Sequence, residues 1–350
     1  MIETPQSFAA TPDVDPGGDV LAEMLRSIRL SGAVFLSASL TEPFGLISPR
    51  HFDERTPMAH LRHVSIFHLI SAGECTVELA SGQRETIRAG DVLLMPFADA
   101  HTFSKGQGGE LGSALDLVRA GPLSGMWNIT HGGGGPETRM VCGFIESSEL
   151  LYSPVFRTLP PLLIDRTGDD KVSALLTTTV REILSLTTDA TPGSEIMLGR
   201  LMELLFVEVL RRYAAGLPES AHGWFAALND PMLGRAMWHV HGNPGRRWTV
   251  HDLAREVGTS RTVLAERFNE VLGQTPIEYV TSWRMQLAAE RMRMGTDGLA
   301  VIANDVGYDS EAAFNRAFKR VTGIAPGRWR DGARSAQPYP RPMRQESSSR

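Results

Sequence analysis

A segment near the C-terminal end of the chain occurs twice, about 50 residues apart. Each copy has a small residue in a short helical pattern, a glycine four residues later, a serine, and two large apolar residues at four-residue steps. The matching positions are Leu253-Ala254 and Ile302-Ala303, Gly258 and Gly307, Ser260 and Ser310, Leu264 and Phe314, and Phe268 and Phe318. In such a unit the alanine lets helices approach, the glycine permits a tight turn, and the serine caps the second helix. The repeat therefore predicts two successive helix-turn-helix units.

The large apolar residues anchor one side of each second helix, so the opposite side must face outward. Arg and Asn can pair with guanine and adenine, Glu accepts from cytosine, and Lys suits phosphate. The candidate DNA-binding residues are Ser260, Arg261, Thr262, Ala265 and Glu266 in the first copy, and Ser310, Glu311, Ala312, Asn315, Arg316 and Lys319 in the second. Thr275-Pro276 is a cap and first-turn pair for a helix that joins the units rigidly. The two recognition helices are expected near one DNA turn, roughly 34 Å, apart.

Charge divides the chain at about the same place. Residues 231–350 carry 18 basic and 12 acidic side chains, whereas residues 1–230 carry 17 and 28. A basic region favours polyanions through phosphate contacts, and an acidic one is repelled by them. Ordinary scatter of surface charge would also account for the basic excess, so charge alone does not decide between the two interpretations.

Residues 248–330 resemble the DNA-binding domain of AraC/XylS-family transcription regulators. The matching pieces are "LAREVGTSRTVLAERF", "GQTPIEYVTSWRMQLA", "IANDVGYDSEAAFNRAFKR" and "GIAPGRWR". The resemblance implies sequence-specific binding to double-stranded promoter DNA, with the recognition helices in successive major grooves. It also implies RNA polymerase as a partner, and it favours activation over repression.

The front half of the chain reads as short strands from about Val34 to Glu146, which predicts an all-β sandwich or barrel with glycine-rich loops between Gly106 and Gly135. The stretch "AGDVLLMPFADAH" has a glycine, a proline and His101 at the spacing of the second cupin motif, and this half resembles the cupin sensor domain of one branch of AraC-type regulators. The expected fold class is an α+β multidomain chain. Its expected parts are an N-terminal segment (1–30), a cupin-like jelly-roll β-barrel that senses an effector (31–158), a helical connector (159–228), an all-α tandem helix-turn-helix domain (229–332) and a disordered basic tail (333–350).

The metal site of metal-binding cupins is not intact in this chain. Ile66 stands at the position of the first motif's glutamate, and Arg62 at that of its second histidine. His68 lies two residues beyond Ile66, on the same face of the strand, and should point inward towards His101. With Cys142 from "VCGF", these residues would form a three-ligand site suited to zinc or another transition metal, or a redox-responsive centre. An apolar small-molecule pocket with hydrogen-bonded core histidines is the alternative.

Two cysteines argue against a disulfide framework and fit a reducing compartment. Cys75 alternates with apolar residues and is expected in the core. His60 and His63 are alternative ligands for the sensor site, although a loop or strand-edge position is expected for both.

The remaining features limit location and class. No run of about 18 uncharged apolar residues occurs, and the start is acidic rather than basic-then-apolar, so we expect a cytoplasmic protein without a membrane span. The helix of "SEIMLGRLMELLFVEVLRRYAAG" is apolar around much of its surface, so it either seals the β domain or forms a homodimer interface. A metal-dependent cupin enzyme with an accessory helical domain is the alternative function. It is disfavoured because the His-x-His and Glu ligands are missing, and we therefore expect no enzyme.

Overall fold

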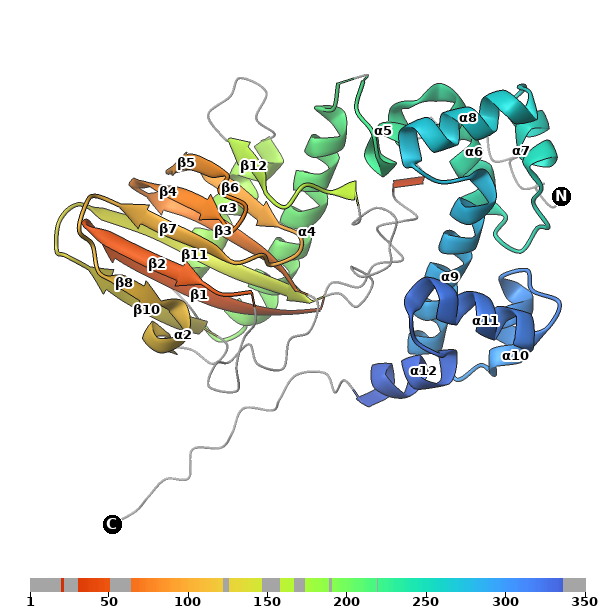
Figure 1. The fold of residues 1–350 in the computed structure, drawn as a ribbon. Helices are drawn as coiled ribbons and strands as arrows, with labels where there is room; N and C mark the ends of the chain where they lie inside the picture. The colour runs from red at the N-terminus through yellow and green to blue at the C-terminus, as the bar shows by residue number, and fades with distance from the viewer. Residues whose placement is uncertain are drawn as a thin grey trace, which may run out of the picture. The chain divides into compact units, whose positions relative to one another are not determined.

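The computed structural model describes residues 20–21, 31–50, 64–121, 126–146, 158–166, 174–188, 191–218 and 220–335. The chain divides into two compact units, which are described separately here (Figure 1). The β unit lies within residues 29–217 and contains the strands with two long helices. The helical unit lies within residues 218–329. The predicted fold class, a β domain followed by an all-α domain, is confirmed.

Two sheets pack face to face in the β unit, and its apolar core lies between them. The larger sheet has, in spatial order, β12 (Leu163–Arg166), β6 (Asp91–Met95), β3 (Val64–Ala72), β11 (Glu137–Glu146), β1 (Ser31–Thr41), β10 (Met126–Gly132) and β9 (Arg119–Ala120). The smaller sheet has β5 (Arg84–Arg88), β4 (Glu74–Leu79), β7 (His101–Lys105), β2 (Phe44–Ser48) and β8 (Leu111–Ser113). The short helix α2 (Ala114–Leu117) follows β8. The segment expected to be glycine-rich loops therefore contains β8, α2, β9 and β10. As expected, Cys75 is buried in the core.

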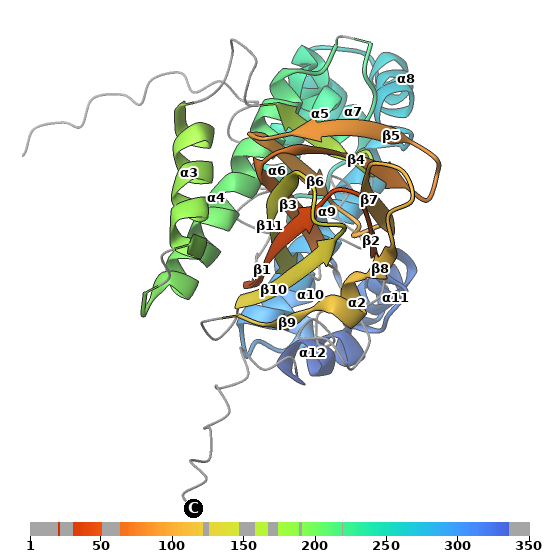
Figure 2. The same cartoon turned by 90° about the vertical axis from the view of Figure 1, so that its left-hand side faces the viewer.

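One helix lies on the outer face of the larger sheet, and a second helix packs against the first (Figure 2). The helix on the sheet is α4 (Ser194–Ala215), and the helix packed against it is α3 (Ala174–Thr188). Phe67 of β3 meets Phe206 of α4 edge to face, with ring centroids 5.9 Å apart. A Cβ atom at Gly143 of β11 would lie 2.3 Å from the Met202 side chain, so glycine permits the close seating of α4. Because β3 is covered on both faces, its first seven residues are all buried.

The predicted connector at 159–228 is not a separate domain. Its first part supplies β12, which pairs with β6 at the edge of the larger sheet, while α4 packs on that sheet and α3 packs on α4. Its last part begins the helical unit, because Trp224 and Phe225 of α5 are buried there. The physical reason is that the apolar face of α4 needs a partner surface, and the sheet provides one.

One face of α4 seals the β unit and another is exposed. Leu205 is fully buried, whereas the neighbouring Leu204 is 38% exposed. Ile196 and Met197 are also exposed on α4, as is Leu175 on α3. The first of the two interpretations, sealing of the β domain, is confirmed, and an apolar face still remains for a partner.

Eight helices lie among the residues that the structure describes after Pro218, and the last of them begins in the helical unit and extends beyond residue 329. They are α5 (Trp224–Asn229), α6 (Pro231–Gly242), α7 (Val250–Glu256), α8 (Arg261–Leu272), α9 (Pro276–Met294), α10 (Leu299–Asp305), α11 (Glu311–Thr322) and α12 (Pro326–Ser335). α12 extends past the expected start of the tail at 333, and residues 336–350 lie outside the described part. The same holds for most of the expected N-terminal segment.

Helix α9 joins the two helix-turn-helix units, as the sequence predicts. Its N-terminus has a capping box between Thr275 and Glu278, with a proline in the first turn. Its buried side carries Tyr279, whose hydroxyl lies 2.7 Å from Nε2 of His241. His241 also stacks on Trp283, with ring centroids 3.8 Å apart. Among the described helices, none is long and apolar enough to cross a membrane.

Candidate functional site

The two recognition helices, α8 and α11, begin in the same way. The Oγ atom of Ser260 accepts a hydrogen bond from Val263 N at 3.2 Å, and Ser310 accepts one from Ala313 N at 3.2 Å. Both helices have twelve residues and follow seven-residue helices, α7 and α10. The two serines are therefore N-caps, which set the start of each recognition helix.

Most of the predicted DNA-binding residues lie on exposed positions of these helices. The exposed ones are Ser260, Arg261, Thr262, Glu266, Ser310, Glu311, Ala312, Arg316 and Lys319. Ala265 is partly buried. Asn315 is also partly buried, and its Oδ1 atom has no hydrogen-bond partner among the described residues. Asn315 therefore lies at the flank of the exposed face, not at its centre.

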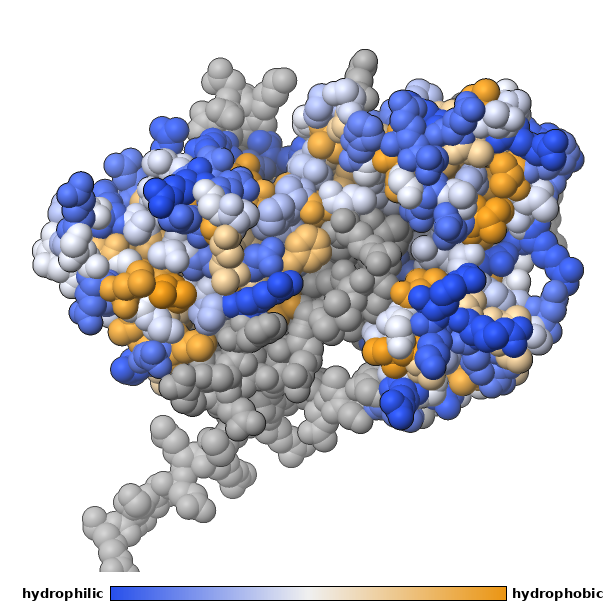
Figure 3. Space-filling model, viewed as in Figure 1, coloured by the Kyte–Doolittle hydropathy of each residue, from blue (hydrophilic) through white to orange (hydrophobic). Residues whose placement is uncertain are grey.

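The exposed faces of α8 and α11 differ in charge. Steps of four and three residues connect Thr262, Glu266 and Asn269 on α8, and Ala312, Arg316 and Lys319 on α11. In the space-filling view the surface over both helices is largely hydrophilic (Figure 3). Among the exposed candidates, Arg261 and Glu266 on α8 cancel, whereas Arg316 and Lys319 outweigh Glu311 on α11. Helix α11 is therefore the stronger attractor of phosphate.

Sequence reasoning missed three exposed residues of this surface. Asn269 and Val263 lie on α8, and Arg320 lies on α11. The helical period, continued one turn further from Glu266, would have found Asn269. Val263 was overlooked because an apolar residue is normally assigned to a core, although apolar side chains can contact the thymine methyl group.

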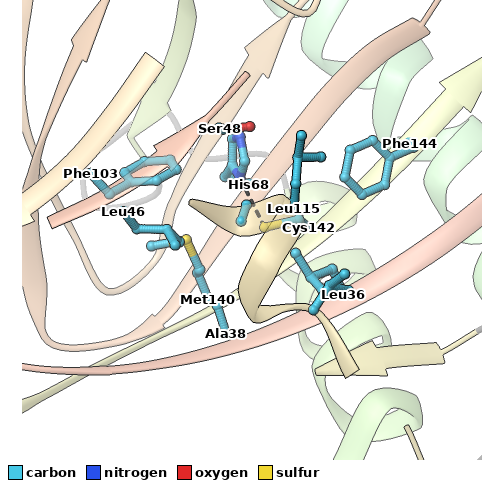
Figure 4. A pocket seen from close by; sticks show the side chains of 12 residues that line it. Leu36, Ala38, Leu46, Ser48, His68, Phe103, Leu115, Met140, Cys142 and Phe144 are labelled. Atoms are coloured by element: carbon cyan, nitrogen blue, oxygen red, sulfur yellow. Dashed lines mark hydrogen bonds between the residues drawn. The ribbon is translucent and has the colours of Figure 1, made fainter. Parts of the chain in front are cut away.

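A second candidate site lies between the sheets of the β unit. His68 on β3 is paired in register with Cys142 on β11, and His68 Nδ1 lies 2.9 Å from Cys142 Sγ (Figure 4). His101 enters from β7, and the centroids of the two imidazole rings are 5.0 Å apart. The structure thus brings together His68, whose inward position follows from strand alternation, with His101 and Cys142, which the cupin resemblance suggested.

All three groups are buried and held in their uncharged forms. Burial lowers the pKa of His68 well below its ordinary value, and neighbouring His101 lowers it further. Burial lowers the pKa of His101 to about 4, although the hydrogen bond to the Asp99 carbonyl, 2.8 Å away, opposes this shift. Burial raises the pKa of the Cys142 thiol. A neutral thiol beside two neutral imidazoles is the resting state of the cluster.

The cluster borders a small apolar cavity. The cavity measures about 20 Å³, and its wall includes Leu36, Ala38, Leu46, Phe103, Met140 and Phe144 beside His68 and Cys142 (Figure 4). The Nε2 atoms of His68 and His101 are both buried and have no hydrogen-bond partner in the described part of the chain. Such atoms are rare in folded proteins, because an unpaired buried polar group is costly.

The same geometry bears on metal binding. Imidazole and thiolate are suitable ligands for zinc, and two imidazole nitrogens are free to bind. However, the described residues contain no group of three or more His, Cys, Asp or Glu side chains placed to hold a metal ion. The Nδ1 atom of His68 faces Cys142 Sγ, and the unpaired Nε2 atom is on the opposite side of the ring. An ion bound at Nε2 would therefore not also reach Cys142 without rearrangement. The alternative ligands His60 and His63 lie outside the described residues.

Comparison with known families separates the two units in the same way. Residues 19–215, more than half of the chain, match the family model of a cupin domain, and residues 253–332 match that of a helix-turn-helix domain. A protein of Streptomyces lividans described as a putative AraC-like transcription regulator is 36% identical over 205 residues, which cover 58% of this chain and 66% of that one. The chain belongs to the AraC family of transcriptional regulators with an N-terminal cupin domain.

Two other relatives match over more of their length. The HTH-type transcriptional regulator AlkR of Acinetobacter baylyi is 29% identical over 281 residues, covering 76% of this chain and 87% of AlkR. The RCS-specific HTH-type transcriptional activator RclR of Escherichia coli is 27% identical over 276 residues, covering 78% and 86%. These relatives are regulators and not enzymes, so the alternative of a cupin enzyme loses its support. Among solved structures, ToxT from Vibrio cholerae has 14% identity and a TM-score of 0.34, covering 87% of this chain and 98% of ToxT.

Proposed function

We propose that this AraC-family protein binds promoter DNA in a sequence-specific manner and regulates transcription in response to an effector held by its cupin domain. The observation that carries the DNA-binding proposal is the pair of equally capped helices, α8 and α11, whose outward faces are polar and exposed. Helices of this kind read base edges in the major groove. Activation through RNA polymerase, a homodimeric state and a cytoplasmic location belong to the same proposal.

The proposal of DNA binding is tested at Arg316. Duplexes selected from a random pool by the full chain define its preferred sequence, and binding to them is measured by fluorescence anisotropy. If Arg316 pairs with a guanine, Arg316→Ala should cost about 1–3 kcal/mol on the preferred sequence and relax the preference at one position.

The matched control for Arg316 is Lys319 on the same face. Because Lys319 is expected to contact phosphate, Lys319→Ala should weaken binding to all duplexes alike and reduce the slope of affinity against salt by about 1. An equal loss on every sequence with Arg316→Ala would indicate a nonspecific architectural DNA protein instead.

For the effector, we propose a small molecule with an apolar body and one polar group. An apolar wall and the unpaired Nε2 atom of the lining residue His68 support this choice, because the wall would bury the body and the nitrogen would hydrogen-bond the polar group. The cavity of about 20 Å³ has room for about one water, so it would have to widen to admit such a ligand. Such a ligand can shift the protein between states only if it binds one arrangement more tightly than the other.

A transition metal such as zinc, or an oxidant acting on Cys142, is the competing proposal for His68, His101 and Cys142. It is tested by elemental analysis of protein purified under reducing conditions and incubated with zinc, beside Cys142→Ala. About one metal per chain, lost in the variant, would favour a His/Cys centre. Metal-free protein in both cases would leave these residues as the lining of an organic pocket.

A further inference from the structure

The loop that leads into the first helix-turn-helix unit touches the second unit directly, in addition to the connection through α9. The loop between α6 and α7 approaches the turn between α10 and α11. A Cβ atom at Gly245 would lie 2.9 Å from the Asp305 carbonyl oxygen, and one at Gly307 would lie 2.6 Å from the Gly245 carbonyl oxygen. Backbone lies against backbone here, so any side chain at either glycine would push the units apart.

Arg284 projects from α9 into this contact. Its Nε donates to the Pro244 carbonyl at 2.8 Å, and one terminal nitrogen donates to the Arg246 carbonyl at 2.7 Å. The other terminal nitrogen donates to the Gly307 carbonyl at 3.4 Å. The first two carbonyls precede the first unit, and the third belongs to the turn of the second. A guanidinium group has its donors in a rigid planar fork, so it fixes the mutual position of the three carbonyls.

Other contacts at this place are weaker or less specific. Arg247 and Asp309 form an ion pair between the same loop and turn, but both side chains are about three-quarters exposed, so the pair is screened by solvent. The Arg284 guanidinium also lies 5.7 Å from the ring centroid of Tyr308. Arg284 is therefore the side chain that bonds both units from the helix between them.

We propose that Arg284 and the Gly245–Gly307 contact hold α8 and α11 at one fixed separation and rotation, so that the protein accepts a single spacing between its two DNA half-sites. Arg284 is thus a positioning residue, and this role rests on the proposed DNA binding. One extra base pair moves the second half-site by about 3.4 Å and turns it by roughly 35°. A rigid pair of recognition helices cannot follow such a change, whereas two units that rock about α9 can.

The first test measures spacing selectivity with full-length protein. The duplex selected by wild type is compared with duplexes that have one base pair added or removed between the half-sites. Wild type should lose about tenfold or more in affinity on the altered duplexes. Arg284→Ala should bind the selected duplex more weakly, and its loss on the altered duplexes should shrink to about twofold. Arg284→Lys should behave like Arg284→Ala, because one ammonium cannot reach three carbonyls.

A glycine pair supplies a second variant and its control. Gly245→Ala places a methyl group against the Asp305 carbonyl, so it should also reduce spacing selectivity. Gly242→Ala lies three residues earlier with nothing within 4 Å of the added atom, so it should keep wild-type selectivity. Folded Arg284→Ala and Gly245→Ala proteins with unchanged spacing selectivity would overturn the proposal.

A DNA-free measurement separates this inference from the proposed function. A double variant, Asn269→Cys with Lys319→Cys, carries one nitroxide label at an exposed position on each of α8 and α11. Double electron–electron resonance between the labels then measures the distance between the recognition helices. A narrow distribution that broadens with Arg284→Ala supports the clamp, even if wild type selects no DNA sequence and the proposed function fails. An equally narrow distribution in both proteins would refute it.

Discussion

The charge state of His68 and Cys142 is controlled by their burial. They face each other on adjacent strands, and both are taken out of water by the core. Burial opposes charge on each, which moves the pKa of the imidazole down and that of the thiol up. Any reaction that needs the thiolate, whether metal binding or oxidation, must first overcome this burial.

The folded β unit should lose stability as the pH falls. The pKa of His101 is lowered to about 4 in the folded chain, while the unfolded chain takes up a proton near pH 6.5. Stability is therefore fully present above about pH 6.5 and is lost progressively as the pH falls towards 4. Between pH 7 and pH 5 the loss from His101 alone should be about 2 kcal/mol, measured by denaturant unfolding.

The control for this pH dependence uses asparagine, which keeps a donor towards the Asp99 carbonyl but does not titrate. His101→Asn should flatten the loss, whereas His222→Asn, at an exposed position, should leave it unchanged. A His101→Asn protein that loses as much stability as wild type would show that His101 is not the titrating group.

At the scale of elements, α4 has one sealing face and one open face. The sealing face meets β3 and β11 through Phe206 and Met202, and the open face carries Ile196 and Leu204. Exposed apolar patches on helices commonly mark interaction sites. A second copy of the chain is the partner that we propose for this face.

Neighbouring leucines on α4 allow the two faces to be tested separately. Leu204→Glu should shift the chain towards monomer and leave the unfolding free energy within about 0.5 kcal/mol, because the residue is on the surface. Leu205→Ala should cost about 2–5 kcal/mol of stability, because a fully buried side chain is removed. Light scattering and denaturant unfolding measure the two effects. No change of mass with Leu204→Glu in a dimeric wild type would place the dimer interface elsewhere.

For the whole molecule, the important feature is that each unit has its own core. The β unit is built around residues between two sheets, and the helical unit around aromatic residues such as Phe268 and Phe314. Chains with separate cores do not generally unfold in one two-state step.

Calorimetry should accordingly show two transitions. Phe268→Ala removes a fully buried ring from the helical unit and should lower the unfolding free energy of that unit by about 3–5 kcal/mol. The transition of the β unit should stay at its wild-type temperature. Equal shifts of both transitions would mean that the units unfold together.

Local patterns predicted the parts of this structure that depend on neighbours in sequence. The serine caps, the glycine turns and the anchoring residues of α8 and α11 all follow from short spacings. Strand alternation placed His68 on an inward position, while the cupin resemblance suggested His101 and Cys142 as its neighbours. The role of Arg284 could not be predicted, because its three acceptors are backbone carbonyls up to 40 residues away. The pairing of β12 with β6 was missed for the same reason, so residues 163–166 were assigned to the helical connector.

Two consecutive residues of β11 face the two sides of the larger sheet, one the cavity and the other α4. Cys142 looks into the cavity, while Gly143, the next residue, lies under Met202 of α4 on the opposite side of the sheet. Because Gly143 has no side chain, Met202 of α4 packs directly on the strand backbone. A displacement of β11 at this point is therefore expected to displace α4 as well. If the proposed effector binds beside Cys142, we expect any shift of β11 to displace α4 and its open apolar face as well, because a close-packed interior does not absorb small movements.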